Sequence, residues 1–460
     1  MKRVALHNLG CKVNYYETEV MRQSLRERGF QMVPFDREAD IYIVNTCTVT
    51  NIADRKSRQI LHRAKQCNPD AVVVAVGCYV QTGREAVERD DCIDLAIGNE
   101  HKKDIADILE AYLEGRQSVT IQENAGKICE YEEMQLRHTG EHTRAYVKIQ
   151  DGCNQFCTYC AIPYARGRAR SRRAEDVIAE VSGLAREGCR EIVLTGIHIS
   201  SYGIDFDEEA WQGGRSERLL RGMRPEYTGG SKLIDLAEML HEIPGVERIR
   251  LGSLEPRVIT EETAGRLAAM SKICPHFHLS LQSGCDATLK RMNRHYTTGE
   301  YYQSVEILRK FFDHPAITTD VIVGFPGETE EEFGRTRAFL EKIRFYEMHV
   351  FKYSRREGTV AASMPGQLSE QVKTARSSEL LELEGRQSVE FRRHYIGREA
   401  EVLLEETREL DGKRYLIGHT KDYVKVAVEA DCTLPRGEMP KINSLVKVPV
   451  RKFMTDEILA

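Results

Sequence analysis

The sequence predicts an α/β protein of three parts: an N-terminal parallel α/β domain, an open partial barrel of six βα units, and a small C-terminal β-barrel. Three observations support this prediction. Apolar runs alternate with stretches of helical period in two separate series, which is typical of parallel sheets. The second series has six units, too few for a closed TIM barrel of eight. Beyond residue 396 the pattern changes to short alternating runs, as in antiparallel strands.

The composition favours a cytoplasmic protein. Charged residues make up 30% of the 460 residues, and no apolar run approaches the roughly 18 residues that a membrane span needs. The N-terminus enters a strand pattern directly, without the apolar core of a signal peptide. Thirteen cysteines in a reducing compartment are more often metal ligands or catalysts than disulfides. Because the net charge is −5, an RNA partner would need a local basic patch.

The N-terminal domain is predicted to span residues 1–117. Its strands are expected in the apolar runs at residues 3–10, 39–45, 71–77 and 94–98. The third run is continuously apolar, as in a strand buried on both faces. Helices are expected between the strands, at residues 16–29, 53–66 and 101–115.

Three cysteines follow strands of this first series. Cys11, Cys47 and Cys78 each come just past the C-terminal end of a predicted strand. Parallel strands end at the same edge of a sheet, where open α/β sheets bind their ligands. The three thiols could therefore meet at one point. The alternative is three unrelated buried thiols, which are common in proteins.

The barrel domain is predicted at residues 145–375, after a polar linker at residues 118–144. Its six strands are expected at residues 145–150, 191–197, 248–254, 276–283, 318–325 and 347–354. Polar and glycine-rich segments follow several of these strands, as in TGIHISSYG and GFPGET. In a barrel, the carboxyl ends of the strands form the face on which sites are built.

The last part of the chain is predicted to contain a connecting helix at residues 376–396 and a β-barrel domain at residues 397–460. Apolar and polar residues alternate in three stretches of this domain, at residues 399–406, 414–429 and 444–453. This is the pattern of short antiparallel strands in a small barrel.

The segment DGCNQFCTYC places Cys153, Cys157 and Cys160 directly after the first barrel strand. Zinc sites are usually closed by four ligands in two separated pairs. Iron–sulfur cubes are held by thiolates, normally one per iron, so three thiolates leave one iron open for another molecule. An incomplete zinc site and a fourth cysteine from elsewhere in the chain are the alternatives.

The CxxxCxxC spacing, with the aromatic Tyr159 before the last cysteine, resembles the signature of the radical S-adenosylmethionine superfamily. The order of the three parts resembles its methylthiotransferases, whose small C-terminal barrel is the TRAM domain that binds RNA or substrate. Three segments, LGCKVN, NTCTVTN and GCYVQ, look most like the branch that acts on threonylcarbamoyladenosine in tRNA.

The resemblance implies two four-iron clusters and S-adenosylmethionine as cofactors. Cys153, Cys157 and Cys160 match the ligands of the radical cluster, and the first cysteine trio matches the ligands of an auxiliary cluster. Tyr159 is expected to pack against the adenine of S-adenosylmethionine. Further cofactor contacts are expected at the strand ends, from Thr195, Gly196, Ser253, Glu255, Gln282, Ser283 and Val323.

The resemblance also implies a reaction. Two S-adenosylmethionine molecules are consumed, one as methyl donor and one as radical source, and a methylthio group is added to C2 of N6-threonylcarbamoyladenosine at position 37 of tRNA. The implied partners are the tRNA anticodon stem-loop, an electron donor such as a flavodoxin or ferredoxin, and a sulfur source. The rival substrates are isopentenyl-adenosine in tRNA and an aspartate of a ribosomal protein. A more distant rival is a non-catalytic iron–sulfur protein that binds RNA or senses redox state.

Two further features stand out. An insertion at about residues 204–232, which contains Trp211, follows a barrel strand, where a shorter loop is usual in this branch. ARGRARSRR, residues 165–173, has five arginines, a residue type that suits phosphate recognition. Arg166, Arg168 and Arg170 are therefore candidate RNA contacts, with a solvated basic turn as the alternative. The other cysteines and the histidines show no metal-ligand pattern.

Overall fold

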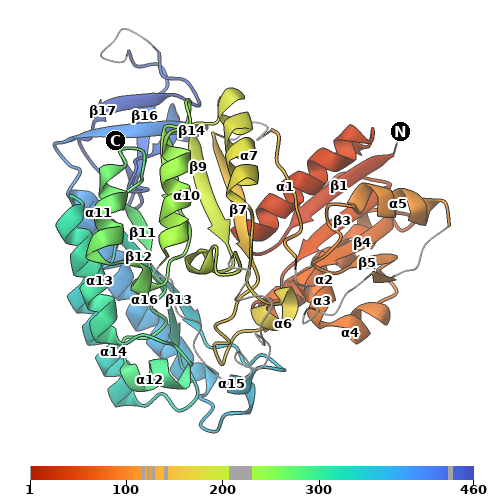
Figure 1. Ribbon diagram of the computed structural model, residues 1–460, viewed down its shortest axis with the longest axis horizontal. Coiled ribbons are helices and arrows are strands. Elements are labelled where there is room, and N and C mark those ends of the chain that lie inside the picture. Colours follow the sequence, from red (N-terminus) through yellow and green to blue (C-terminus); the bar gives the residue numbers. More distant parts are fainter. Residues whose placement is uncertain are drawn as a thin grey trace.

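The computed structural model describes residues 2–115, 120–121, 125, 130–138, 143–206, 230–433 and 439–460. Figure 1 shows an N-terminal α/β domain beside a barrel of strands and helices, with a small sheet covering one end of the barrel. Most of the insertion that the sequence predicted, including Trp211, lies outside the described residues.

The N-terminal domain has one parallel sheet in the order β2-β1-β3-β4-β5-β6. The strands are β1 Arg3–Asn8, β2 Gln31–Met32, β3 Ile41–Thr46, β4 Val72–Gly77, β5 Leu95–Ile97 and β6 Thr120–Ile121. The helices are α1 Lys12–Glu27, α2 Asn51–Cys67, α3 Cys78–Thr82, α4 Arg84–Glu88 and α5 Ile105–Leu113. The predicted parallel α/β domain is confirmed, although β6 lies within the segment expected to be a linker.

Both faces of this sheet are buried, which explains its continuously apolar strands. Along β4, Val74 and Val76 pack into one apolar core, while Val73 and Ala75 pack into a second core on the other face. Helix α1 contributes to the first core, for example through Met21, and α2 contributes to the second. Successive side chains of a strand point to opposite faces, so every position needs an apolar residue.

The barrel consists of two neighbouring sheets, ordered β10-β9-β7-β8 and β11-β12-β13. Its parallel strands are β7 Arg144–Asp151, β9 Glu191–Gly196, β10 Arg248–Leu251, β11 His276–His278, β12 Ala316–Val323 and β13 Glu347–Lys352. A parallel bridge between Leu254 and Leu279 links the two sheets. The short β8, Arg170–Ser171, pairs antiparallel with β7, so β8 and β13 are the free edges. The predicted open six-stranded barrel is confirmed.

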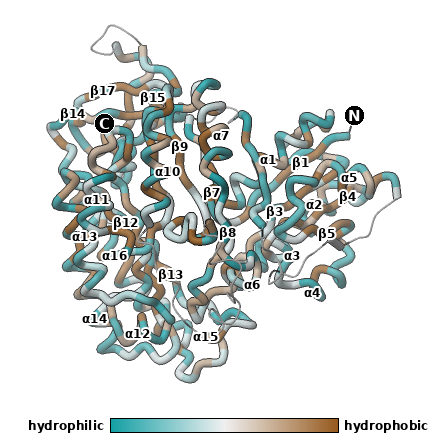
Figure 2. The backbone as a smooth tube through the Cα atoms, viewed as in Figure 1, coloured by the Kyte–Doolittle hydropathy of each residue, from teal (hydrophilic) through white to brown (hydrophobic). Residues whose placement is uncertain are grey.

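Helices cover the outside of the barrel (Figure 1). They are α7 Ala174–Arg186, α10 Ser231–His241, α11 Glu261–Ala269, α13 Thr298–Phe311 and α14 Glu330–Ile343. The segments that follow the strands contain the short helices α6 Ile162–Arg166, α12 Asp286–Arg291 and α15 Val360–Ser363 and the 3₁₀ turns η2 Ile199–Ser201 and η3 Pro256–Val258, and α6 packs against α3 of the N-terminal domain. Figure 2 shows hydrophobic residues along the barrel strands and hydrophilic residues on the outer helices. Helices α11, α13 and α14 each begin with a reciprocal capping box, which satisfies backbone donors at the helix start.

The C-terminal domain is a five-stranded sheet in the order β17-β14-β15-β16-β18. Its strands are β14 Glu399–Leu410, β15 Lys413–His419, β16 Lys425–Glu429, β17 Leu445–Pro449 and β18 Ile458–Leu459, and the connecting helix is α16 Glu370–Arg393. The helix starts before residue 376, where it was expected, because Ser369 caps it by accepting from the Val372 amide. The domain docks on the starts of the barrel strands: Arg248 donates to the His419 carbonyl at 2.8 Å and Arg250 to the Lys421 carbonyl at 2.9 Å.

Within the described part of the chain, no helix combines the length and the apolar character that a membrane crossing requires.

Residues 130–138 connect the first two domains and pack against both. The Tyr131 hydroxyl donates to the Lys148 carbonyl of the barrel at 2.9 Å. Glu132 accepts from the Lys103 amide of the N-terminal domain at 3.0 Å, and Tyr16 of α1 donates to the Met134 carbonyl at 2.6 Å. This part of the predicted linker is therefore an ordered strap between the two domains.

We expect Glu132→Gln to stabilise the protein at alkaline pH. Burial raises the pKa of Glu132 from 4.5 to about 7, so the folded protein holds this proton more tightly than the unfolded chain does. The free energy of unfolding should therefore fall as the pH rises from about 4.5 to about 7. The substitution should raise the free energy of unfolding by on the order of 3 kcal/mol at pH 8 and should change it little at pH 4.5. Thermal unfolding at the two pH values measures this difference.

Glu130→Gln is the matched control, since Glu130 is exposed and two residues away. It should leave the unfolding temperature nearly unchanged at both pH values. An equal effect of the two substitutions at pH 8 would mean that Glu132 is not a buried, protonated carboxyl.

Candidate functional site

The first cysteine trio lies at the carboxyl edge of the N-terminal sheet. Cys11 precedes α1, Cys47 follows β3, and Cys78 is the first residue of α3 after β4. Gly10 has φ +102°, and a Cβ on it would lie 2.8 Å from the Cys47 sulfur. Only glycine allows the chain before Cys11 to approach Cys47 this closely.

Positive and polar groups surround these thiols. The Arg166 Nε donates to the Cys78 sulfur at 3.3 Å, and Asn99 Nδ2 donates to it at 3.5 Å. Burial, and after it the charges of Cys78 and Cys11, raise the pKa of Cys47 to about 11, although Arg166 acts in the opposite direction. Thiolates gathered at one edge of a sheet repel one another and therefore need positive charge nearby, which bound iron supplies.

The second cysteine trio occupies the loop that follows β7. Gly152, at φ +67°, starts this loop, and a Cβ there would lie 1.9 Å from the Arg168 carbonyl oxygen. Backbone amides point at two of the sulfurs, with Gln155 donating to Cys153 and Ile162 donating to Cys160, each at 3.4 Å. Hydrogen bonds of this kind stabilise cluster thiolates.

An arginine that is distant in the chain donates a hydrogen bond to one sulfur of the second trio. Arg294 donates from Nη1 to the Cys157 sulfur at 3.2 Å. Burial, followed by the charge of Cys157, raises the pKa of Cys160 to about 12. The thiolate forms therefore need a bound cation, as an iron–sulfur cluster provides.

The spacing of the sulfurs argues against a single zinc ion at either trio. Among the described residues, neither trio has three ligand atoms that all lie within 4.8 Å of one another. Thiolates around one zinc would be about 3.8 Å apart, because each Zn–S bond is about 2.3 Å. The wider spacing suits a larger, multi-iron group.

A buried ion-pair network beside the first trio joins the N-terminal domain to the barrel. The carboxylate of Glu17 on α1 accepts from Lys102 at 2.5 Å, from Lys148 of β7 at 2.8 Å and from Arg166 at 2.8 Å. Burial alone would raise the pKa of Glu17, but Arg166 and the two lysines hold it well below its ordinary value. Because Arg166 also reaches Cys78, the network fixes the edge of the N-terminal sheet against the barrel.

The positions expected to contact S-adenosylmethionine lie at or just after the strand ends, as the sequence predicted. Glu255, after β10, accepts from Gln155 of the cysteine loop at 3.4 Å and from Arg257 Nη2 at 2.6 Å. Burial opposes its ionisation, but His198 and Arg257 hold the pKa of Glu255 at about 2. Tyr159 packs edge-on against Phe325, with ring centres 6.4 Å apart.

The remaining expected contacts differ in exposure. Thr195 and Gly196 end β9, Ser253 is exposed after β10, and Gln282 adopts φ +70° after β11. The Ser283 hydroxyl is buried against Thr336 of α14 at 3.2 Å, and the Val323 side chain is buried in the core between strands and helices. These last two side chains point away from the barrel interior, which leaves only their backbone atoms for a cofactor.

Comparisons with known proteins agree with this geometry. Residues 147–340 match the Radical SAM superfamily, and residues 3–98 match the family described as Uncharacterized protein family UPF0004. The chain is 39% identical, over 98% of its length and 94% of the relative's, to "Threonylcarbamoyladenosine tRNA methylthiotransferase MtaB" of Bacillus subtilis. The chain belongs to the radical S-adenosylmethionine methylthiotransferase family. Within this family it lies in the MtaB branch.

Other relatives of this methylthiotransferase are more distant. It is 33% identical to a "tRNA-2-methylthio-N(6)-dimethylallyladenosine synthase" of Acetivibrio thermocellus, over 99% of this chain and 89% of the relative. The solved structure of TsrM, a radical S-adenosylmethionine methyltransferase from Kitasatospora setae, shares its fold with a TM-score of 0.53 and 16% identity, covering 76% of this chain and 73% of that one. Family membership implies a four-iron cluster and S-adenosylmethionine.

The arginines of the methylthiotransferase's basic segment are mostly buried. Arg166 and Arg170 are 0% and 2% exposed, and Arg170 donates to the Arg166 carbonyl and reaches Glu100 at 3.4 Å. These two side chains pair with groups of the protein rather than with solvent, which corrects the RNA-binding role expected of them. Arg168 is half-buried and stacks over the Phe156 ring at 4.5 Å.

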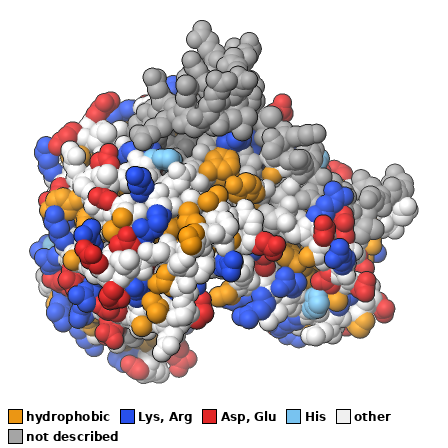
Figure 3. All heavy atoms as spheres, turned by 90° about the horizontal axis from the view of Figure 1, so that it is seen from below, with side chains coloured by type: hydrophobic (Ala, Val, Ile, Leu, Met, Phe, Trp, Pro, Cys, Tyr) orange, Lys and Arg blue, Asp and Glu red, His pale blue; other side chains and the backbone are white. Residues whose placement is uncertain are grey.

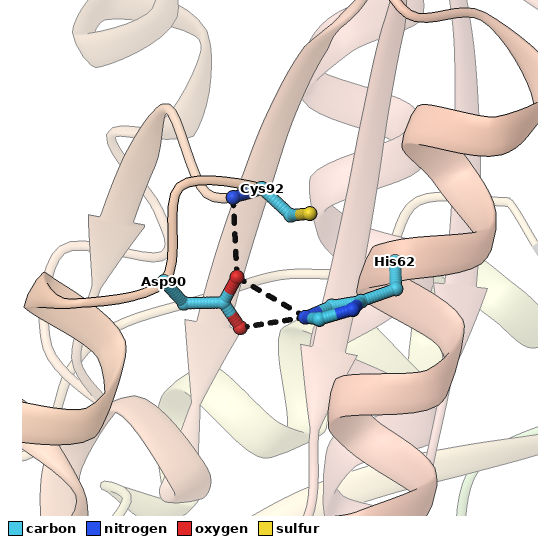
Figure 4. A group of neighbouring side chains, drawn as sticks. All are labelled: His62, Asp90 and Cys92. Atoms are coloured by element: carbon cyan, nitrogen blue, oxygen red, sulfur yellow. Dashed lines mark hydrogen bonds and ion pairs between the residues drawn. The ribbon is translucent and has the colours of Figure 1, made fainter.

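Two groups of potential metal ligands were not indicated by the sequence. His62, Asp90 and Cys92 meet on the surface of the N-terminal domain (Figure 4), where Asp90 accepts from the Cys92 amide at 3.1 Å and lies 2.9 Å from His62. This arrangement is a turn cap with an exposed ion pair.

The second group lies in the barrel and joins neighbouring strands. His278 of β11 is 3.3 Å from the Asp320 carboxylate of β12, and the rings of His278 and His349 stack at 5.9 Å. Since Phe277 packs outward into the core between strands and helices, His278 faces the barrel interior. These residues form part of the polar lining of the interior.

The most informative residue that sequence reasoning missed is Arg294. It lies 137 residues from Cys157 in the chain, in a segment without any motif. Its role depends on how α12 and the cysteine loop meet: the Thr158 amide donates to the Met292 carbonyl at 3.1 Å, and Asn293 donates to the Phe156 carbonyl at 3.1 Å.

Proposed function

We propose that this protein adds a methylthio group to C2 of N6-threonylcarbamoyladenosine at position 37 of tRNA. The observation that carries the proposal is the side chain of Arg166. It lies six residues after Cys160 in the chain (166 − 160), and it donates to Cys78 of the first trio at 3.3 Å. The segment that follows the second trio is thus attached to the first trio, which brings the two thiolate sites into neighbouring parts of the fold, as a reaction that needs both a radical source and a sulfur carrier requires. The name of the 39% identical relative supports threonylcarbamoyladenosine as the substrate.

In this proposal Cys153, Cys157 and Cys160 hold one four-iron cluster, and the first trio, Cys11, Cys47 and Cys78, holds a second. When bound, these groups supply reductive cleavage of S-adenosylmethionine and the sulfur that is transferred. The protein contributes the charge that stabilises the thiolates, from Arg294 at Cys157 and from Arg166 at Cys78.

The strand-end residues are proposed to position S-adenosylmethionine. With its low pKa, Glu255 stays ionised and can accept hydrogen bonds from the cofactor. Tyr159 offers an apolar ring within a small cluster that contains Phe325. The other proposed contacts are Thr195, Gly196, Ser253 and Gln282, with Ser283 and Val323 contributing backbone atoms.

Three proposed domains carry this function. The boundaries 1–117, 145–375 and 397–460, with α16 between the last two, fit the four sheets apart from β6. The C-terminal domain is proposed to bind the anticodon stem-loop. Figure 3 views the molecule from the end opposite to this domain in Figure 1, where basic and hydrophobic side chains lie side by side. An electron donor of the flavodoxin or ferredoxin type and a separate sulfur source complete the proposed partners.

An anaerobic assay tests the proposed function. The iron-loaded protein, S-adenosylmethionine and a reductant are incubated with anticodon stem-loops that carry threonylcarbamoyladenosine, isopentenyl-adenosine or unmodified adenosine. Mass spectrometry of the nucleosides should find the 2-methylthio product with the first RNA. Product with only the second RNA would identify the rival tRNA substrate, and a methylthio group on ribosomal protein alone would identify the protein substrate. Absence of any product with active protein would contradict the proposal.

A further inference from the structure

A cavity of about 700 Å³ lies where the three domains meet. Cys11 and Lys12 line it from the N-terminal domain, Arg144 and Tyr146 from β7, and Tyr423 from the C-terminal domain. The cavity therefore runs from a cysteine of the first trio to the domain proposed to bind RNA. Its volume is in the range of small-ligand sites, so the cavity is large enough for a single nucleobase.

Apart from Lys12, the lysine and arginine side chains that line this cavity are paired with acidic residues of the protein. Arg144 pairs with Glu405 and also donates to the Tyr423 hydroxyl at 2.7 Å. The remaining pairs are Arg408 with Glu406 at 2.7 Å and Lys425 with Glu457 at 3.5 Å. These cations already have an anionic partner, so they contribute little net attraction for a ligand carboxylate.

Lys12 differs from its neighbours in the cavity. Its side chain makes no hydrogen bond or ion pair with any residue that the structure describes, and its Nζ lies 6.0 Å from the centre of the Tyr146 ring. Asp320 and Glu191 act on Lys12 from beyond ion-pair distance, and Arg144 and Arg250 act against them. A lysine without a paired anion, beside an aromatic wall and next to Cys11, is placed to bind a negatively charged group.

We infer that Lys12 binds the carboxylate of the threonylcarbamoyl group while the adenine enters the cavity. This inference rests on the proposed function. A threonylcarbamoyl group carries a carboxylate, whereas the dimethylallyl group named for other relatives is apolar. In adenine, C2 and the N6 substituent both flank N1. A side chain adjacent to Cys11 can therefore hold the substituent while C2 faces the sulfur site.

One aromatic residue of the cavity fits the same role. Tyr146 offers a ring against which an unstacked base can pack, the usual way in which proteins hold single-stranded RNA bases. Tyr423 of the C-terminal domain is already stacked on His419 and covered by the guanidinium groups of Arg144 and Arg250, so it shapes the wall of the cavity and does not stack on the base.

The test compares binding of two anticodon stem-loops to the iron-loaded protein. One carries threonylcarbamoyladenosine, and the other carries its carboxamide analogue, which has nearly the same shape and no charge. The wild-type protein should bind the carboxylate form at least about 10-fold more tightly, since a hydrogen bond between charged groups is being compared with a neutral one. Equal affinities would overturn the inference, and this measurement does not depend on any variant folding.

Variants of Lys12 test whether this residue causes the preference for the carboxylate RNA over the carboxamide RNA. Lys12→Met should bind both RNAs equally, Lys12→Arg should keep most of the preference, and Lys310→Met, on an outer helix and paired with Glu261, should behave as wild type. A Lys12→Met variant that keeps the full preference would place the carboxylate elsewhere.

The inference and the proposed function fail in distinguishable ways. If wild-type protein methylthiolates the threonylcarbamoyl RNA but binds the carboxamide equally well, only the role of Lys12 is wrong. If wild-type protein gives no methylthio product with that RNA, the proposed function itself is wrong.

Discussion

Replacing Cys47 by alanine should abolish methylthiolation of tRNA while 5′-deoxyadenosine continues to form from S-adenosylmethionine. Replacing Cys160 by alanine should abolish both products. The reason is that each trio lies at the edge of its own sheet, and Cys47 makes no contact with the loop of Cys153, Cys157 and Cys160 among the described hydrogen bonds. Chromatography of the small-molecule product and of the tRNA nucleosides measures the two outcomes separately.

Iron content and a third cysteine provide the controls. The wild type should hold about eight irons, and the Cys47→Ala and Cys160→Ala variants about four each. Cys189→Ala removes a buried thiol that donates to the Glu191 carbonyl at 3.4 Å and belongs to neither trio, so it should keep about eight irons and both products. Circular dichroism of all variants checks for unfolding after loss of a cluster. Normal methylthiolation by Cys47→Ala would show that the first trio is three unrelated buried thiols.

Replacing Glu17 by glutamine should lower the free energy of unfolding by about 3–5 kcal/mol at pH 7, because it leaves the buried Lys102 without its carboxylate partner. Lys148 and Arg166 would keep only Asp151 as a buried anion. The effect should depend on pH. Since the pKa of Glu17 is lower in the folded protein than in the unfolded chain, its stabilisation is present above pH about 4.5 and is lost as the pH falls. Denaturant unfolding at pH 7 measures the first effect, and a series of pH values from about 4.5 downward follows the second.

Glu19→Gln is the matched control on the same helix. Glu19 pairs with Arg22 near the surface, with side chains 20% and 27% exposed, and pairs of this kind contribute about 0–1 kcal/mol. Equal losses for the two substitutions would mean that the buried network does not hold the domains together.

The sequence was sufficient to predict where the cysteines gather. Cys11, Cys47 and Cys78 follow strands whose apolar periods are unmistakable, and parallel strands end at one edge as a matter of geometry. The six barrel strands were predictable for the same reason. Both predictions depend on local patterns and on a rule of topology, and neither requires knowledge of side-chain contacts.

The basic segment shows what a local pattern does not contain. Five arginines in nine residues read as a surface patch, yet Arg166 is buried because its partner Glu17 lies 149 residues away in the chain. Arg294 was missed for a similar reason, since its contact with Cys157 spans two elements. Long-range ion pairs depend on how the domains pack, and this packing cannot be predicted from the local composition of a segment.

The location of the C-terminal domain has a consequence for how reactants reach the site. The domain and the cavity beside it lie at Arg144, where β7 starts, whereas the second cysteine trio follows the other end of the same strand. An eight-residue strand is about 26 Å long at roughly 3.3 Å per residue. Under the proposed function, the anticodon base enters beside the start of β7 while S-adenosylmethionine binds near its end, so the adenine and the cofactor have to meet inside the barrel between these two ends.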